Sequence, residues 1–531
     1  MSPETLGAPR GTASPTTGLA ATQSAPAAPD PTWSEARPGD LTAQQIMASG
    51  TPTRHVFINA GPGTGKTTVA AQRFGALRFS AESRTDDRAV VAVSFTRAAT
   101  WNLHRRVSRI WGPTALVWPH RIVTLDAIMC DLFHDLLGCG LLVWPNGHTT
   151  LRVEDSWNVL GGSFWTRQAY RVSITAGGVI EVVTGYSKKP SQRAPSSEIS
   201  KQLLAGTCTH EDLRDLLESA LSNPDVVNRV RNRLAATMRA LIVDEVFDAN
   251  DLDIAVIELA VEAAVDVTLV GDPWQALYVF RGARPEVVPE LLIRTKMRTL
   301  PLTQSFRWRT SGQQELADTL RAGESVALDQ ATHGGANVDA DVVLASTWNQ
   351  LWEVDNHVLP LAFHAFKGGL EEAAATVLLN HITRSVFSED ATYLGDSLTA
   401  LAIDDADVPR QLEPDLQRVV EILLTPGRDT LKAAYEDLVR VIKTVSPREL
   451  RAAHHAHTKR LAGIAVRLSP HDRPVPGLTI HQAKGREWDV VGVTPSDSER
   501  LRLQLGLVVT EDTDRKLYVA CTRARYLTVQ V

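Results

Sequence analysis

Runs of apolar residues that end in glycines or acids predict the buried strands of this chain. HVFINAGPGTGKTTVAAQRF predicts a strand from Val56 to Asn59, followed by a glycine-rich turn and a helix. RALIVDEVFD predicts a second strand that ends at Asp244, and a third strand leads into Asp272. ADVVLAST predicts one more strand in the C-terminal half. Strands of this kind, separated by helical segments, indicate an α/β protein with parallel sheets.

Three stretches follow other patterns. YRVSITAGGVIEVVTG alternates apolar and polar residues, which predicts a β-hairpin. Residues 371–470 are helix-prone and predict a helical segment. Residues 1–38 are rich in Ala, Pro, Thr, Ser and Gly, and such a segment buries too little apolar surface to offset the entropy lost on ordering. We therefore expect a disordered tail at the N-terminus.

Composition and charge indicate which kinds of protein this chain does not resemble. The chain has 531 residues, 44% of them hydrophobic, and a formal net charge of -6, so a polyanion would have to bind in a local groove. The four cysteines are scattered without a CxxC pair, which indicates neither a disulfide framework nor a zinc ribbon. No apolar run approaches the roughly 20 residues of a membrane span, and the N-terminus lacks signal-peptide features. We expect a cytoplasmic protein without a membrane partner.

The glycine-rich turn has the chemistry of a phosphate-binding loop. Its glycines let backbone amides face phosphates, Lys66 would reach the β- and γ-phosphates, and Thr67 would bind magnesium. Ala60 stands where the strict pattern has glycine. The loop predicts ATP and Mg²⁺ as ligands, although a P-loop alone indicates only a nucleotide. The predicted nucleotide-binding residues of this segment are Ala60, Gly61, Pro62, Gly63, Thr64, Gly65, Lys66, Thr67 and Thr68.

Acids and aromatics at the ends of later strands predict a hydrolytic site. Asp244 could hold magnesium through water, and Glu245 could polarise the attacking water. Gln275 could sense a γ-phosphate. Tyr278 and Phe280 lie next to Arg281, and aromatic rings beside a cation suit the stacked bases of a single strand. Taken alone, this aromatic pair would suit a hydrophobic core equally well.

The order of these motifs resembles that of superfamily 1 DNA helicases of the UvrD/Rep/PcrA type. The motifs that carry the resemblance are AGPGTGKTT, SFTRAA, VDEVFD, VGDPWQALYVFRGA, QSFR, TIHQAKGREWDVV and LYVACTRAR. The resemblance implies two RecA-like P-loop NTPase domains with parallel sheets, each carrying a mainly helical insertion. We expect the first domain at 39–135 and 236–300, its insertion at 136–235, the second domain at 301–370 and 471–531, and a reduced helical insertion at 371–470.

The resemblance also implies roles for further residues. On the nucleotide side, Gln45 would bond the adenine edge and Phe306 would stack on adenine. Arg307 would approach the γ-phosphate, Glu487 would link to the nucleotide, and Arg523 would be the arginine finger. The implied DNA contacts are Phe95, Thr96, Arg97, Thr479 and His481, in addition to Tyr278 and Phe280. The complete predicted catalytic set is Lys66, Asp244, Glu245, Gln275, Arg307 and Arg523.

Three positions depart from the family pattern. Phe247 replaces a glutamine beside the acid pair, which puts the coupling between ATP and DNA in doubt. Asp126 stands where histidine is common, so a DNA contact there is in doubt. Thr68 replaces an arginine that many members carry against the adenine, so base selectivity would be looser.

The sequence predicts an ATP-dependent helicase or translocase that tracks on single-stranded DNA or a single/double-strand junction, with a role such as DNA repair. Its 3′-to-5′ polarity comes only from the resemblance. One alternative is a translocase that strips proteins and barely unwinds. Another is a regulatory ATPase subunit of a nuclease or defence complex, and a third is a nucleotide-binding module without turnover. His454, His455 and His457 predict a solvated helix face rather than a metal site.

Overall fold

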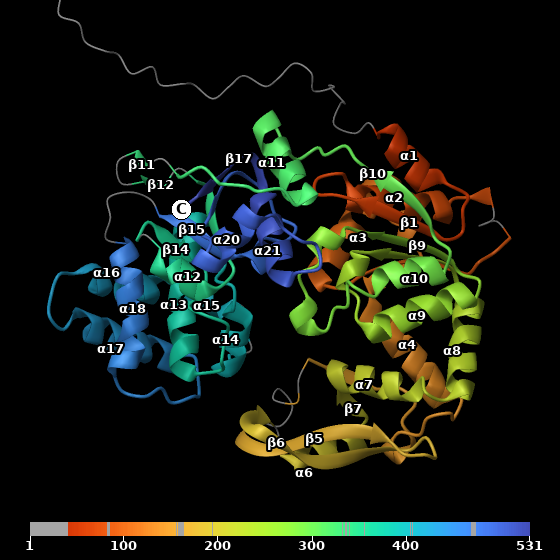
Figure 1. Ribbon diagram of the computed structural model, residues 1–531. Helices are drawn as coiled ribbons and strands as arrows, with labels where there is room; N and C mark the ends of the chain where they lie inside the picture. Colours follow the sequence, from red (N-terminus) through yellow and green to blue (C-terminus); the bar gives the residue numbers. More distant parts are fainter. Residues whose placement is uncertain are drawn as a thin grey trace, which may run out of the picture. The chain divides into compact units, whose positions relative to one another are not determined.

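The computed structural model describes most of the chain beyond the N-terminal segment. The described residues are 41–81, 85–155, 157, 164–193, 195–331, 333–334, 337–338, 340–354, 356–403, 405, 407–468 and 474–531. The predicted disordered tail, 1–38, lies outside them. Figure 1 shows the order of helices and strands along the chain.

A six-stranded parallel sheet forms the first half of the fold. Its strand order is β10-β1-β9-β8-β2-β3. Because every strand is parallel, the carboxyl ends of β1, β9 and β8 meet at one edge, where polar loops can converge. The strands are β1 (Val56–Ala60), β2 (Ala89–Ser94), β3 (Arg121–Thr124), β8 (Met238–Asp244), β9 (Asp266–Gly271) and β10 (Arg298–Leu302).

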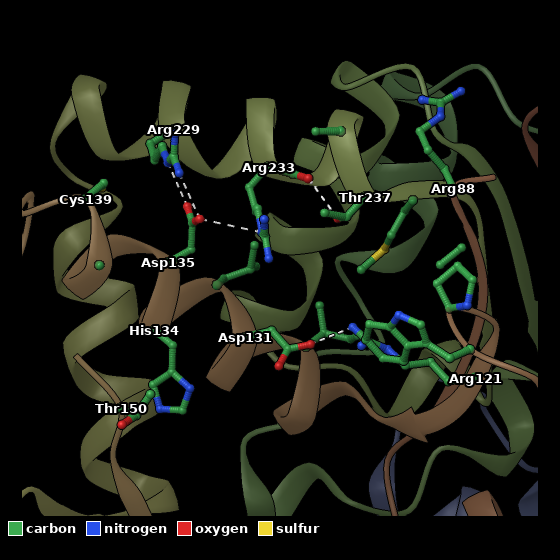
Figure 2. A pocket seen from close by; sticks show the side chains of 18 of the residues that line it. Arg88, Arg121, Asp131, His134, Asp135, Cys139, Thr150, Arg229, Arg233 and Thr237 are labelled. Atoms are coloured by element: carbon green, nitrogen blue, oxygen red, sulfur yellow. Dashed lines mark hydrogen bonds and ion pairs between the residues drawn. The ribbon is translucent and has the colours of Figure 1, made fainter. Parts of the chain in front are cut away.

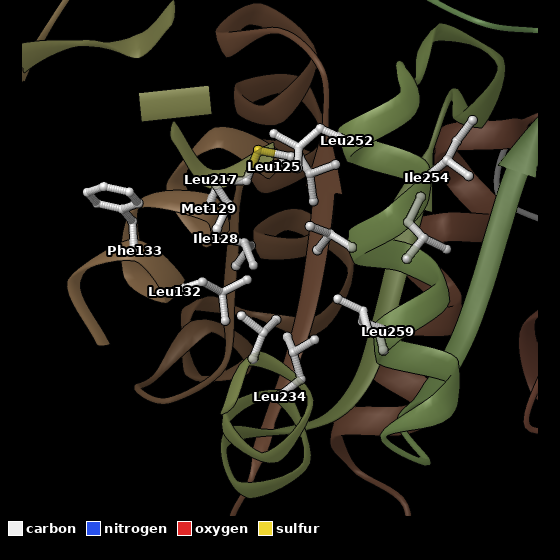
Figure 3. Close-up of a cluster of buried hydrophobic side chains, with 14 of the residues drawn as sticks. Leu125, Ile128, Met129, Leu132, Phe133, Leu217, Leu234, Leu252, Ile254 and Leu259 are labelled. Atoms are coloured by element: carbon white, nitrogen blue, oxygen red, sulfur yellow. The ribbon is translucent and has the colours of Figure 1, made fainter. Parts of the chain in front are cut away.

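Helices cover both faces of this sheet, as its side-chain alternation requires. Val91 and Val93 of β2 face one apolar core, and Val90 and Ala92 face the other. Figure 3 shows the first core, in which α4 and α9 contribute most of the labelled side chains. The helices on that side are α4 (Leu125–Gly138), α8 (Pro224–Thr237), α9 (Asp251–Glu262) and α10 (Val288–Arg294). Those on the opposite side are α1 (Ala43–Gly50), α2 (Lys66–Arg78) and α3 (Arg97–Trp111).

The segment between α4 and α8 contains the predicted hairpin. Strands β5 (Phe164–Ile174) and β6 (Ile180–Arg193) pair antiparallel, which confirms the hairpin predicted from the alternating pattern. The short strands β4 (Arg152–Glu154) and β7 (Thr207–Thr209) form a second pair. Helices α6 (Ser196–Leu204) and α7 (His210–Ala220) complete the segment.

A five-stranded parallel sheet with the order β14-β15-β13-β16-β17 forms the second half. Its strands are β13 (Val342–Ala345), β14 (Val358–Pro360), β15 (Val475–Thr479), β16 (Trp488–Val493) and β17 (Ala524–Gln530). The accompanying helices are α11 (Ser311–Ala322), α12 (Trp348–Glu353), α19 (Ile480–Ala483), α20 (Asp497–Leu505) and α21 (Asp512–Cys521). Strands β11 (His333–Gly334) and β12 (Asn337–Val338) pair separately.

A helical segment with its own apolar core is inserted between β14 and β15. Helix α13 packs against α14, α16, α17 and α18, and their buried side chains form a third cluster. The bounds are α13 (Leu370–Phe387), α14 (Leu394–Ala400), α15 (Val408–Gln411), α16 (Glu413–Leu424), α17 (Thr430–Lys443) and α18 (His455–Leu468). The predicted fold class, α/β with two parallel sheets that each carry a mainly helical insertion, is confirmed, and the first insertion also contains the β5–β6 hairpin.

Candidate active site

One cavity of about 1170 Å³ collects most of the predicted nucleotide residues. It lies at the carboxyl ends of strands from the first sheet and is also lined by segments next to the second sheet. Its predicted residues are Gln45, Gly61, Gly63, Gly65, Lys66, Thr67, Thr68, Phe95, Thr96, Asp244, Glu245, Gln275, Tyr278, Phe306, Arg307, Glu487 and Arg523. The predicted residues outside the lining are Ala60, Pro62, Thr64, Arg97, Phe280, Thr479 and His481.

The turn between β1 and α2 needs glycine at two positions. Gly63 and Gly65 have φ angles of 72° and 87°, a region that favours glycine. A Cβ atom on Gly65 would lie 2.7 Å from Nε2 of Gln45, and one on Gly63 would lie 2.6 Å from Cβ of Arg307. Other segments therefore pack directly against the turn, and larger residues would displace them.

Two neighbouring segments hold the turn through its carbonyl oxygens. Gln45 Nε2 donates to the carbonyl of Thr64 at 2.9 Å. The Ser305 hydroxyl donates to the carbonyl of Pro62 at 2.9 Å, and the Phe306 amide donates to the carbonyl of Gly63, also at 2.9 Å. These hydrogen bonds use only carbonyl oxygens of the turn. A phosphate also accepts hydrogen bonds, so it would not compete for these carbonyl oxygens. The Gln45 side chain is thus engaged with the turn, and its contact with adenine stays a prediction.

Lys66, Thr67 and the acid pair converge at the start of α2. Lys66 Nζ lies 3.8 Å from Glu245, and the Thr67 hydroxyl donates to Asp244 Oδ2 at 3.4 Å. Burial and the neighbouring Glu245 raise the pKa of Asp244 to about 7, and Lys66 opposes this shift. Glu245 has a φ of 62°, which is strained for a residue with a side chain.

This group fits a magnesium ion. Asp244 Oδ1 is buried without a hydrogen-bond partner, and a hydroxyl and a second carboxylate lie beside it. Oxygen ligands with a net negative charge are what Mg²⁺ prefers. A cation there would also favour the ionised form of Asp244, whose charge burial otherwise opposes.

Two buried arginines enter the cavity from the second half of the chain. Arg307 donates to the carbonyl of Thr522 at 2.7 Å, and its Nε lies 3.1 Å from Glu487 Oε1. Arg523 is 1% exposed, and its Nη2 is buried without a hydrogen-bond partner. Burial, followed by the charge of Arg307, lowers the pKa of Arg523 to about 9. The Nε of Arg523 donates to the carbonyl of Val519 at 3.0 Å, which leaves Nη2 as the unsatisfied donor, and a buried donor of this kind is suited to an anionic ligand.

Gln275 is held beside the cavity by a charged pair. Its amide nitrogen donates to Asp272 at 2.7 Å, and Asp272 forms an ion pair with Arg321 of α11 at 2.9 Å. The side chain of Gln275 is therefore connected to an element of the second half of the chain.

The predicted DNA-contacting residues are divided between the cavity and its surroundings. Phe280 is 65% exposed, so its ring is not in a core, and it makes an edge-on contact with His481 at 5.0 Å between ring centres. His481 Nε2 donates to the carbonyl of Leu277 at 3.2 Å, and burial lowers the pKa of His481. Tyr278 lies 6.1 Å from Phe280 between ring centres. Thr479 is only 5% exposed and lies in the interior.

The remaining predicted DNA contacts lie at the start of α3. The Thr96 hydroxyl accepts from the amide of Ala99 and so caps the helix. Arg97 is exposed and forms a surface ion pair with Asp155 at 2.9 Å. Surface pairs of this kind contribute little to stability, so a phosphate could compete for Arg97.

Sequence reasoning missed several charged residues of the site. Arg105, Arg106 and Arg109 of α3 line the cavity, and Arg106 donates to the hydroxyl of Thr68. The HRRVSR run indicates a basic helix face. The sequence alone could not show that this face points toward the cavity. Lys484, in the TIHQAKGREWDVV motif, forms a buried ion pair with Asp248.

The departures from the family motifs have structural explanations. Phe247 is buried against Phe57, with the rings edge to face and 6.0 Å apart, and packs close to Gly271. It is a core residue in this chain. Asp126 forms an ion pair with Arg214, which also bonds Asp253 at 2.8 Å.

A second cavity, of about 800 Å³, lies beside α4 and α8 (Figure 2). Its arginines are neutralised within the protein. Arg229 bonds Asp135 at 2.7 Å, and Arg121 pairs with Asp131 at 2.5 Å. The paired charges leave little net field for a charged ligand, in contrast to the first cavity.

Within the described residues, no three His, Cys, Asp or Glu side chains are grouped to hold a metal ion, and the rings of His454 and His457 contact each other edge to face. None of the helices in that part of the chain is both long and apolar enough to cross a membrane.

The fold and the site define a protein with a P-loop-like turn and two parallel α/β sheets. Residues 43–281 match the family model described as an AAA domain. The chain is 23% identical over 358 residues to the ATP-dependent DNA helicase Rep of Escherichia coli, covering 62% of this chain and 49% of the relative. It is also 23% identical over 340 residues to the Rep helicase of Salmonella typhimurium, covering 58% of this chain and 47% of the relative.

These matches confirm the resemblance of the chain to superfamily 1 helicases of the UvrD/Rep type. The chain spans about half the length of the curated relatives it matches.

Proposed function

We propose that this protein is an ATP-dependent motor that tracks on single-stranded DNA. The observation that carries the proposal is the composition of the nucleotide cavity. It combines the P-loop residues Lys66 and Thr67 with an acid pair from β8 and with two arginines from the second half of the chain. Mere nucleotide binding needs neither a water-polarising acid nor two arginines at the phosphate end.

Each residue has a role in hydrolysis under this proposal. Lys66 binds the β- and γ-phosphates, and Glu245 orients and polarises the attacking water. Thr67 and Asp244 hold Mg²⁺, which supplies charge neutralisation at the phosphate oxygens when bound. Arg307 and Arg523 stabilise the negative charge that develops on the transferred group. The buried position of both arginines strengthens this interaction, because water screens it little.

Hydrolysis is coupled to movement because the site is built from two halves of the chain. ATP attracts Lys66 from one half and Arg523 from the other, so its γ-phosphate draws them together. Loss of that phosphate removes the shared ligand and lets them separate. If each half holds the strand in turn, the cycle moves the protein along it.

Polarity and unwinding are the finer parts of the proposal. We propose 3′-to-5′ movement from the resemblance to UvrD/Rep-type helicases. The segment inserted between β14 and β15 is the short helical group α13–α18, which supports translocation more strongly than robust unwinding. The second candidate is a regulatory ATPase subunit of a nuclease or defence complex, and the short inserted segment supports it as well.

Steady-state ATPase assays test the proposal. We expect strong stimulation by a single-stranded DNA oligonucleotide, with weaker stimulation by RNA or duplex DNA. Turnover that is the same with and without every nucleic acid would contradict a coupled motor and favour the regulatory subunit. Strand-displacement assays with 3′- and 5′-tailed duplexes would then determine polarity.

A further inference from the structure

Helix α3 presents an exposed tryptophan that the fold does not need. Trp101 is 59% exposed. It lies two residues, about 200° of helix rotation, from Leu103, which together with Val107 faces the core. The helix therefore already has its apolar stripe, and Trp101 lies on the opposite face. The exposed ring is therefore free to contact a ligand.

Arginines flank this tryptophan along the same helix face. Arg97, Trp101 and Arg105 are spaced four residues apart and so share one face. The guanidinium carbon of Arg105 lies 4.7 Å from the centre of the Trp101 ring. Within the described residues, Arg105 has no ion pair with a carboxylate. This face thus carries two guanidinium groups with one aromatic ring between them, and the Arg97 group is shared with Asp155 in a surface ion pair.

This face of α3 lies next to residues that we propose to contact single-stranded DNA. Phe95 and Thr96 immediately precede the helix and line the nucleotide cavity, and Arg105 lines it further along. Trp101 is a single ring between cations rather than part of an apolar patch, because the next exposed apolar residue of α3, Ile110, points to the other side. Aromatic rings beside cations suit stacked bases and backbone phosphates.

We propose that Trp101 and Arg105 form a base-stacking station for single-stranded nucleic acid, with Trp101 contacting a base and Arg97 and Arg105 contacting phosphates. The inference rests on the proposed function for the class of ligand and adds a contact outside the family motifs. It extends the track from Phe95 along α3.

Binding of a fluorescein-labelled oligo-dT strand to the full chain, followed by anisotropy, tests the proposal. Trp101→Ala should weaken binding by about 5- to 150-fold, and Trp101→Phe should retain most of the affinity. The ATP concentration for half-maximal turnover should stay unchanged. Arg105→Ala should also weaken binding and lower the slope of log affinity against log salt by about 0.7.

Trp118 provides a matched control. It is 76% exposed and carries Arg121 over its ring at 5.3 Å, but it lines the second cavity, where Arg121 is paired with Asp131. Trp118→Ala should bind the strand as the unchanged protein does. An abasic strand of the same length separates stacking from charge, because the loss caused by Trp101→Ala should disappear on it.

The outcomes distinguish this inference from the proposed function. If the unchanged protein binds oligo-dT and Trp101→Ala binds it equally well, the stacking station is wrong and the motor proposal stands. An equal loss for Trp101→Ala and Trp118→Ala, or an undiminished loss on the abasic strand, would also overturn it. If the unchanged protein binds no single strand at low salt, both proposals fail.

Discussion

Lys66 lies in the first turn of α2, with its ammonium group 3.8 Å from Glu245. Its neighbours in the turn are fixed by positive φ angles and by bonds to other segments, so its position is determined before a nucleotide arrives. Preorganised charges of this kind contribute most to phosphoryl transfer, because little reorganisation remains to be done. At the scale of single residues, the proposal therefore depends on a few buried charges.

Replacing Lys66 by alanine removes the cation that we propose to neutralise the β- and γ-phosphates. We expect ATP turnover of Lys66→Ala to fall to background in a steady-state assay. Lys432→Ala, which changes an exposed lysine of α17, is the matched control and should keep full turnover. Normal turnover by Lys66→Ala would show that the site has been assigned to the wrong residues.

Arg523 should act in the transition state more than in binding. We expect Arg523→Ala to bind ATP nearly as well as the unchanged protein but to hydrolyse it about 10³-fold more slowly. Equilibrium binding of a fluorescent ATP analogue and single-turnover hydrolysis measure the two effects. Because Arg523 is buried, Arg523→Ala also removes packing. Arg523→Lys is therefore a second variant, which keeps a positive charge and fills more of the buried space than alanine does. A slow but folded Arg523→Lys would show that the guanidinium matters, whereas equal losses in binding and hydrolysis would contradict the finger role.

At the scale of elements, His120 stabilises the junction between β2 and β3. It precedes β3, and its Nδ1 accepts a hydrogen bond from the amide of Val90 at 3.0 Å. Burial, and then the charges of Arg78 and Arg239, lower its pKa to about 4. The neutral ring is therefore the form that the folded protein keeps.

This lowered pKa makes stability depend on pH. The unfolded chain takes up a proton near the ordinary histidine pKa of about 6.5, whereas the folded protein resists protonation until about pH 4. The contribution of His120 to stability is thus fully present above pH 6.5 and is lost as pH falls toward 4, by at most about 1.4 kcal/mol per pH unit. Thermal unfolding between pH 4 and 8 measures this. The Tm of the unchanged protein should fall more steeply below pH 6.5 than that of His120→Gln, and parallel curves would disprove the role.

Local patterns predicted the elements well because each element is built from neighbouring residues. The strand before the P-loop, the strand ending at Asp244 and the hairpin of β5 and β6 all follow from their apolar patterns. Contacts between distant segments could not be predicted in this way. Asp126, for example, pairs with Arg214, which is 88 residues away.

The same limit applies to the candidate site. The P-loop and acid pair have motifs of their own, so their residues could be selected from the sequence. Arg106 reaches Thr68 only because α2 and α3 cover the same face of the sheet. Phe247 could be recognised as a departure, but its contact with Phe57 of β1 joins segments about 190 residues apart in the sequence, so its burial could not be predicted from the motif.

At the scale of the whole molecule, one buried ion pair joins the two halves of the chain near both predicted ligands. Lys484, after α19, pairs with Asp248, which lies three residues beyond Glu245. Lys484 Nζ is also 5.0 Å from the centre of the Tyr278 ring. Burial raises the pKa of Asp248 to about 6, and the attraction of Asp248 and Glu245 outweighs burial to raise the pKa of Lys484. The pair is therefore ionised at neutral pH.

We expect this pair to transmit DNA binding to the ATP site. Lys484→Met leaves a buried carboxylate without its partner, which costs about 3–5 kcal/mol and lowers Tm. It should also reduce the stimulation of ATPase by single-stranded DNA while basal turnover persists. The double variant Lys484→Met with Asp248→Leu separates the effects, because it should regain stability without regaining stimulation. Full stimulation of the double variant would show that the pair is only structural.

The bonds that Ser305 and Phe306 make to the P-loop have a mechanical consequence. The segment 303–307 leads from the first sheet toward the second, and it is tied to the P-loop at Pro62 and Gly63 and to Thr522 through Arg307. Any rotation that carries Arg523 away from Lys66 must therefore either bend the main chain beside Arg307 or break these bonds. Under the proposed function, this segment would be a hinge inside the active site, and we expect substitutions that change its stiffness to alter kcat and KM together. If the proposed motor function is correct, we expect this short peptide to affect both the length of each step and the rate of hydrolysis.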